Sequence, residues 1–385
     1  MPDAASSPAA HPVFAGQGTT IFETMSRLAQ AHGAINLGQG FPDDPGAEDV
    51  RRAAADALMD GWNQYPSMMG LPELRQAVAA HARRFYGLEV DWATETIVGS
   101  GATEILAATL LALLNTGDEV VVFQPCYDAY VPMIRRAGGV PRLVTLRPPD
   151  WSFDLNELRA AVTPRTRLIL LNTPHNPTAK VFSAEELAEI AQLVDGTGIA
   201  VLCDEVYEHI TFDGRPHVPL MTLPGMRERT VRVGSAGKTF SLTGWKVGYA
   251  SGPAGLIGLI AKAHQFLVFT TAPNLQAGVA YGLGKPDDFF TGLAAEMQRR
   301  RDRFMAGLAA RGYRVLPCAG TYFCAIDVSP EEDMAFCQRL TADHGVAAIP
   351  LSAFYPDSPW HGGVRFCFAK ADAVLDAGLA RLPQA

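Results

Sequence analysis

With 385 residues, of which 48% are hydrophobic and 19% charged, the chain is large enough for two hydrophobic cores and too apolar for general disorder. The formal net charge of -8 argues against nucleic acid as a partner, because a phosphate backbone requires clustered cations. No apolar run approaches the ~18 residues of a membrane span and no signal-peptide pattern is seen, so we expect a cytoplasmic protein with small-molecule ligands and no membrane partner.

The N-terminal stretch and the cysteines carry no strong functional signal. Residues 1–12 are predicted to form a disordered tail, and residues 13–48, rich in glycine and proline near their end, to form a segment that joins a small domain. The six cysteines are scattered and form no CxxC pair. Reduced thiols are therefore expected, with neither a metal site nor a disulfide framework.

The middle of the chain alternates short apolar runs with amphipathic segments such as 183–194. Nearly uninterrupted apolar runs are typical of strands that are buried on both faces, so we expect a mostly parallel sheet flanked by helices. Ligand-binding groups should then gather at the carboxyl ends of the strands. The predicted large domain spans residues 49–285, with strands at 96–100, 119–125, 140–146, 167–172, 200–205, 231–235 and 247–252.

After residue 285 the pattern changes. A long charged helix is predicted over 287–312, followed by apolar runs at 314–317, 321–328, 346–351 and 363–369, with a helix at 331–345 and another at the end. This pattern indicates a smaller α+β domain over residues 286–385. The fold class is therefore α/β with a second, smaller α+β domain.

The first strand-end loop, "GSGATEIL", joins a predicted strand to a predicted helix. The backbone N-H groups of Gly101, Ala102 and Thr103 can cradle a phosphate there. The spacing matches neither a dinucleotide fingerprint nor a Walker loop, so the motif alone is weak. The next strand ends at Tyr127, an aromatic ring able to stack on a planar ligand, although a half-buried structural tyrosine is the commoner case.

The later strand ends carry polar groups of more specific chemistry. Asn176 lies in a proline-rich turn, Asp204 and Tyr207 follow an apolar strand, and Lys238 follows "VRVGS". Burial lowers the pKa of a lysine amine, as a Schiff-base nucleophile requires. A single lysine is usually a solvated surface group, but this interpretation weakens once four such residues converge on one edge of a sheet.

Five motifs together identify a resemblance: "SAGKTFSLTGWKVGY", "NTPHNPTAK", "DEVYEH", "GATEIL" and "INLGQGFPD". Together they resemble the fold-type I, pyridoxal 5'-phosphate-dependent aminotransferases of class I/II, and most closely the bacterial methionine aminotransferases and their kynurenine/glutamine aminotransferase relatives. The resemblance extends from about Gly18 to Lys370. It implies a homodimer with shared active sites.

The resemblance implies roles around the cofactor ring. Lys238 would form the Schiff base, and Asp204 would pair with the pyridinium nitrogen. Tyr207 and Asn176 would hydrogen-bond the phenolic oxygen, while Tyr127 would stack on the ring.

It also implies a phosphate site. Lys246 stands where much of the superfamily has an arginine, so the phosphate loses a bidentate partner and must depend more on its other ligands. Tyr65 would reach across the dimer interface to the neighbour's phosphate. The remaining implied phosphate ligands are Ser235, Gly101, Ala102 and Thr103.

For the substrate, the resemblance implies that Arg365 binds the α-carboxylate, with Asn176 and the Gly38 backbone close by. Candidates for the side-chain pocket are Ile21, Tyr322 and Phe269, each of which is more often a core residue. Ala179 replaces a glycine found in many relatives, and no catalytic role depends on it.

The implied reaction transfers the amino group of a large neutral amino acid, such as methionine, glutamine, an aromatic residue or kynurenine, to a 2-oxo acid. A β-lyase acting on cysteine conjugates is the alternative on the same scaffold. A DNA-binding regulator is disfavoured because few residues precede the resemblance. A nicotinamide dehydrogenase is disfavoured because its glycine fingerprint is missing.

Overall fold

The structure is a computed structural model that describes residues 10–385. Of the predicted disordered tail, residues 1–9 lie outside the described residues. Its last residue, Pro12, begins the short helix α1 (Pro12–Ala15). No helix within residues 10–385 has the length and apolarity that crossing a membrane requires.

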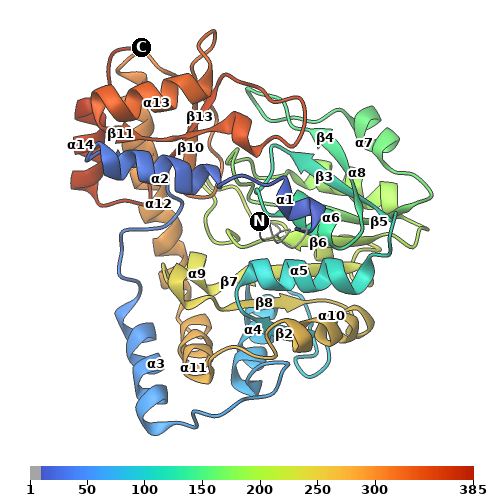
Figure 1. Ribbon diagram of the computed structural model, residues 1–385. Helices are drawn as coiled ribbons and strands as arrows, with labels where there is room; N and C mark the ends of the chain where they lie inside the picture. The colour runs from blue at the N-terminus through green and yellow to red at the C-terminus, as the bar shows by residue number, and fades with distance from the viewer. Residues whose placement is uncertain (1–9) are drawn as a thin grey trace, which may run out of the picture.

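A seven-stranded sheet forms the centre of the molecule (Figure 1). Its strand order is β2-β8-β7-β6-β5-β3-β4, and β8 alone runs antiparallel to its neighbours. The α/β class and the mostly parallel sheet predicted from the sequence are thus confirmed. The strands are β2 (Thr96–Gly99), β3 (Glu119–Gln124), β4 (Val140–Thr145), β5 (Thr166–Asn172), β6 (Ala200–Asp204), β7 (Thr230–Ser235) and β8 (Gly248–Ser251).

Both faces of this sheet are buried, which explains the uninterrupted apolar runs. In β3, Val121 and Phe123 pack into one hydrophobic cluster, while Val120 and Val122 pack into another. Helices α5 (Ala102–Leu113), α6 (Tyr130–Arg136) and α10 (Ala254–Leu267) cover the second cluster. Helices α7 (Leu155–Ala161) and α8 (Ala184–Val194) cover the first, and α8 begins with a capping box between Ser183 and Glu186.

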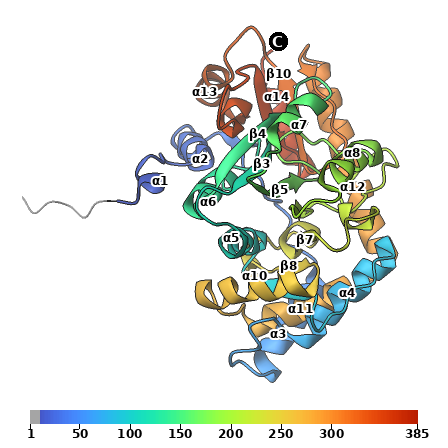
Figure 2. The same ribbon diagram turned by 90° about the vertical axis from the view of Figure 1, so that its right-hand side faces the viewer.

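Three further helices pack together at the β2 end of the sheet (Figure 2). They are α3 (Glu48–Asp60), α4 (Pro72–Tyr86) and α11 (Pro273–Leu283). Their apolar faces meet Val98 of β2 and Tyr249 of β8 in a third cluster. Short helical turns complete this part of the chain: α9 (Ala236–Thr239), η1 (Leu220–Thr222) and η2 (Thr243–Trp245).

The C-terminal part is built on an antiparallel four-stranded sheet of order β12-β13-β10-β9. It follows the long helix α12 (Asp287–Ala309), and the predicted domain boundaries at 48/49 and 285/286 stay a prediction. The elements are β9 (Arg314–Val315), β10 (Phe323–Asp327), α13 (Asp333–His344), β12 (Ile349–Pro350), η3 (Leu351–Phe354), β13 (Gly363–Cys367) and α14 (Asp372–Arg381).

The N-terminal segment packs against this C-terminal part (Figure 1). Helix α2 (Ile21–Ala31) lies beside α13, and β1 (Ile35–Asn36) pairs in parallel with β11 (Val346–Ala347). The apolar run 346–351, expected as one strand, is therefore divided between β11 and β12, which join different sheets.

Candidate active site

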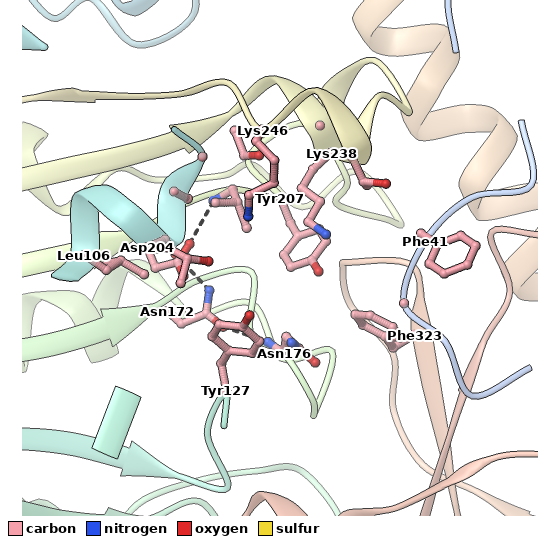
Figure 3. Close-up of a pocket in the computed structure, with 18 of the residues that line it drawn as sticks. Phe41, Leu106, Tyr127, Asn172, Asn176, Asp204, Tyr207, Lys238, Lys246 and Phe323 are labelled. Atoms are coloured by element: carbon pink, nitrogen blue, oxygen red, sulfur yellow. Dashed lines mark hydrogen bonds between the residues drawn. The ribbon is translucent and has the colours of Figure 1, made fainter. Parts of the chain in front are cut away.

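A cavity of about 350 Å³ opens where the parallel strands end, between the seven-stranded sheet and the C-terminal part (Figure 3). Most residues that the sequence singled out line it together. The predicted site residues that line the cavity are Gly101, Ala102, Thr103, Tyr127, Asn176, Asp204, Tyr207, Ser235, Lys238, Lys246 and Arg365.

Lys238 lies in α9, the short turn that follows β7. Its Nζ donates to the Tyr322 hydroxyl at 3.0 Å, and that hydroxyl donates to the Gly40 carbonyl at 2.8 Å. Burial lowers the pKa of the Lys238 amine to about 8. About a tenth of the amine is therefore unprotonated at pH 7, far more than for an ordinary lysine, as a nucleophile requires.

Asp204 is the last residue of β6 and is buried. One of its carboxylate oxygens accepts from the Tyr130 hydroxyl at 2.6 Å, and the other accepts from the Val206 N-H at 3.3 Å. Burial raises the pKa of Asp204 to about 6. Its hydrogen-bond partners are neutral groups, so a cation brought to this carboxylate would be held strongly.

Arg365 projects from β13 and is fully buried. Its Nη1 donates to Asn176 Oδ1 at 2.7 Å and its Nη2 to the Gly38 carbonyl at 3.0 Å. The Nε group is buried without a partner, and the guanidinium lies 3.9 Å from the centroid of the Phe323 ring. Desolvation lowers the pKa of Arg365 to about 10, so it stays charged at neutral pH and can bind a carboxylate.

Two positioning residues were missed by the sequence analysis. Tyr130 holds Asp204, and only its position three residues after Tyr127 hinted at it. Asn172 donates from Nδ2 to the Asp204 carbonyl at 2.8 Å and accepts at Oδ1 from the Asn176 N-H at 2.8 Å. It therefore fixes the turn that presents Asn176 relative to the end of β6.

An anion-binding end of the cavity lies at the N-terminus of α5. Gly101 precedes the helix with φ 84°, and a Cβ there would lie 3.2 Å from Lys246 Nζ. A Cβ on Gly248 would lie 2.5 Å from the Ala102 nitrogen. The first N-H groups of a helix have no partner within it, and the helix dipole favours an anion there. These N-H groups and Lys246 suit a phosphate.

The donor set thus fits pyridoxal 5'-phosphate. Lys246 and the α5 N-terminus match its phosphate, and the buried Asp204 carboxylate matches a protonated ring nitrogen. The Lys238 amine, with its lowered pKa, matches the aldehyde.

Five predicted site residues do not line the cavity of the single chain. The Tyr322 hydroxyl accepts a hydrogen bond from Lys238, and the Gly38 carbonyl accepts one from Arg365. Ile21 packs against the core, while Tyr65 and Phe269 lie elsewhere on the surface, with their ring centroids 5.6 Å apart. The apolar wall consists instead of Phe22, Phe41, Phe323, Leu106, Val206 and Val247, which the sequence analysis did not identify.

Comparisons with known proteins agree with this geometry. The family model for aminotransferase class I and II matches residues 32–382. The chain is 44% identical to methionine aminotransferase of Escherichia coli, covering 95% of this chain and 96% of the relative. It is 39% identical to kynurenine--oxoglutarate transaminase of Dictyostelium discoideum, with 93% and 92% covered. The solved structure of N-succinyldiaminopimelate aminotransferase from Mycobacterium tuberculosis superposes with a TM-score of 0.93 at 43% identity, covering 97% of this chain and 99% of that one.

Proposed function

The chain belongs to the class I and II aminotransferase family and is a transaminase, and we propose that it uses pyridoxal 5'-phosphate to transfer the amino group of a large neutral amino acid to a 2-oxo acid. The proposal rests on one observation. A buried amine with a lowered pKa, a buried carboxylate and a buried guanidinium meet in the same cavity, at Lys238, Asp204 and Arg365.

The bound cofactor would supply an aldehyde that condenses with amines and a ring that accepts the electron pair left when the substrate's Cα-H bond breaks. Lys238 Nζ would hold the cofactor between turnovers and carry the proton removed from Cα. The Tyr322 hydroxyl, 3.0 Å away, keeps this amine in place. Asp204 would hold a proton on the ring nitrogen, and Tyr130 and Val206 orient its carboxylate.

The two ends of the cavity orient the reactants. Arg365, which lines the cavity, would bind the substrate α-carboxylate with its guanidinium, while Lys246 and the α5 N-terminus would hold the phosphate. Holding both ends would restrict the orientation of the substrate's Cα in the cavity and so favour loss of its proton over loss of its carboxylate.

The cavity lining supports a neutral donor. Its cations are Lys238, Lys246 and Arg365, and no fourth lysine or arginine among residues 10–385 lines it. Each of the three already has a proposed partner, so a second carboxylate on the substrate would lack a counter-charge. Phe22, Phe41 and Phe323 suit an apolar or aromatic side chain.

A donor screen tests the proposal. Purified protein loaded with the cofactor is offered methionine, phenylalanine, glutamine, kynurenine, aspartate and N-succinyldiaminopimelate, each with a 2-oxo acid acceptor. We expect methionine and an aromatic donor to exceed aspartate by at least about tenfold in kcat/KM, because burying an unpaired carboxylate costs more than ~1.4 kcal/mol. No turnover of any neutral donor would overturn the proposal. Release of pyruvate from a cysteine conjugate would instead indicate the β-lyase alternative.

We also propose a cytoplasmic homodimer. All six cysteines are buried free thiols, which suits a reducing compartment. Trp62, Tyr65 and Phe266 expose 77%, 82% and 85% of their surfaces, and Phe269 lies against Tyr65. Such large exposed aromatic side chains are typical of a surface that a partner covers. Light scattering on the purified protein measures the molecular mass and should give twice 41.3 kDa.

A further inference from the structure

A second polar cluster lies behind the active site, on the opposite side of the 204–209 segment. Asp204 and Tyr207 line the cavity, whereas Glu205 and Glu208 do not. Both glutamates are buried and pair with Arg232 of β7, Glu205 through Nε at 2.5 Å and Glu208 through Nη2. The proposed transaminase chemistry uses none of these three side chains.

The cluster has too little permanent positive charge. Among the described residues, Arg232 is the one arginine or lysine that forms salt bridges with Glu205 and Glu208, and Arg84, close to His81, is already paired with Asp287. Glu208 accepts from Arg232 Nη2 with one carboxylate oxygen, while its other oxygen has no hydrogen-bond partner. Buried charges without compensation are expensive, so a further cation would stabilise the cluster.

Two imidazole rings meet at this cluster. His81 of α4 and His209 approach through their Nε2 atoms at 2.7 Å. Phe85 and Phe290 hold the rings in place, with centroids 4.7 Å from His81 and 4.6 Å from His209, respectively. One Nε2 donates and the other accepts in this hydrogen bond, so one ring must change its tautomer before both Nε2 lone pairs can bind a metal.

Several polar atoms here are buried without a hydrogen-bond partner. Glu208 Oε1 and Glu205 Oε1 are among them, although Glu208 is only 3% exposed and Glu205 fully buried. The other Glu208 oxygen accepts from the Tyr86 hydroxyl at 2.7 Å. His217, whose Nε2 lies 2.9 Å from Glu205 Oε2, has an unpartnered Nδ1. The buried Tyr249 hydroxyl beside Glu208 also lacks a hydrogen-bond partner, and such unpartnered buried groups indicate a missing cation or water.

We propose that His81 Nε2, His209 Nε2 and a carboxylate oxygen of Glu208 form a binding site for a divalent transition metal, with Zn²⁺ as the best match. The ligand atoms all lie within 4.8 Å of one another. Zinc bonds of ~2.0–2.2 Å in a tetrahedron separate ligand atoms by ~3.3 Å. Binding requires the two nitrogens to move apart and the carboxylate to approach. A water or hydroxide would complete the four ligands.

The ligand types select the metal. Two imidazoles and one carboxylate suit zinc, whereas Mg²⁺ and Ca²⁺ prefer oxygen ligands throughout. Both imidazoles would bind as Nδ1-H tautomers, so two neutral rings ligate without net loss of a proton. The ion would add the missing positive charge beside Glu208 and tie α4 to the segment that carries Asp204 and Tyr207.

The site is tested on full-length holoenzyme without a polyhistidine tag, after removal of metal with a chelator. Equilibrium dialysis against Zn²⁺ should give about one zinc per chain. His209→Asn, at the least buried of the three ligands, should lower the affinity at least tenfold, and His81→Gln should do the same. His264→Asn is the matched control, because His264 is also buried and bonds a carboxylate, Glu104 at 3.0 Å, outside the cluster.

Thermal unfolding provides a second readout that does not depend on catalysis. Zinc should raise the Tm of the wild-type protein and of His264→Asn, but not that of His209→Asn, because a ligand stabilises only the state that binds it. Equal zinc content in the wild-type protein and in folded His209→Asn would overturn the proposal, as would no zinc in the wild type. Neither result bears on transamination, which the donor screen tests separately.

Discussion

At the scale of single residues, the site depends on buried groups whose pKa values are shifted by burial. Lys238 and Asp204 shift in opposite senses, since desolvation disfavours a cationic amine and an anionic carboxylate alike. Both groups are thereby poised to react with or bind a partner. Three predictions belong to this scale.

Lys238→Ala should abolish the absorbance band of the Schiff base and lower kcat by at least about 10⁴-fold, because the covalent nucleophile and the proton carrier are both lost. The fold should persist, since the hydrogen bond that is lost joins Lys238 to one side chain, Tyr322. Absorbance after cofactor addition, together with circular dichroism, checks this. An unchanged spectrum would mean that another lysine is the nucleophile.

Tyr322→Phe should lower the Lys238 pKa below about 8, because a buried ammonium loses the oxygen that accepts from it at 3.0 Å. The rate at which cofactor-free protein condenses with pyridoxal phosphate should then reach half its maximum at a lower pH than in the wild type. A stopped-flow absorbance series across pH 6–10 measures the midpoint. An unshifted midpoint would show that Tyr322 serves packing alone.

Asp204→Asn should stabilise the cofactor-free protein as the pH rises. The folded pKa of about 6 lies above the ordinary 3.8, so burying the charge of Asp204 costs almost no folding free energy below pH 3.8 and about 3 kcal/mol well above pH 6. Urea unfolding of both proteins at pH 4 and pH 7 measures the difference, which should appear only at pH 7. The same substitution should weaken cofactor binding, so a stabilised holoenzyme would contradict the proposed role.

The residues could be predicted from the sequence only where a motif names them. Lys238, Asp204 and Arg365 each belong to a motif that named them as site residues, and all three line the same cavity. Tyr130 and Asn172 were missed because each acts by a hydrogen bond to another site residue, a relation that appears only after strands distant in sequence become neighbours. The sequence analysis named Ile21 of α2 as a pocket residue, whereas its neighbour Phe22 lines the cavity.

At the scale of elements, strand β8 and helix α5 shape the phosphate end together. The strand passes so close to the start of α5 that only a glycine at position 248 fits beside the Ala102 nitrogen. A prediction follows from this close approach.

Gly248→Ala should lower cofactor affinity at least tenfold, because its Cβ would lie 2.5 Å from the Ala102 nitrogen and push the helix N-terminus out of place. Gly255→Ala, in α10, is the matched control: nothing lies within 4 Å of its Cβ. Titration of cofactor-free protein by fluorescence gives the Kd. Equal affinities in the two variants would contradict this account of the phosphate end.

The elements themselves were largely predictable. The seven strands of the central sheet were anticipated because burial on both faces leaves long apolar runs. The run 346–351 was not resolved into β11 and β12, since hydrophobic pattern does not reveal which sheet a strand joins. That choice depends on β1, more than 300 positions away.

At the scale of the whole molecule, a dimer with shared sites remains a proposal, and hybrid dimers can test it. If Tyr65 of one subunit serves the site of the other, a dimer of one Lys238→Ala chain and one Tyr65→Ala chain contains one intact site and one doubly damaged site. Mixing the two weakly active variants under conditions of subunit exchange should restore up to about half the wild-type activity per hybrid dimer. Sites that are complete within one chain would show no such recovery.

The β1–β11 pairing sets a constraint on how the protein is made. Ile35 leaves the ribosome long before Val346, the residue beside it in the β1–β11 pair of the finished molecule. At ~5–20 residues per second the interval is on the order of tens of seconds. During that time the segment that carries Gly38 and Gly40 has no strand to join. The nascent enzyme must therefore remain inactive until translation is nearly finished, and a truncation before β11 should leave the early segment exposed to proteases.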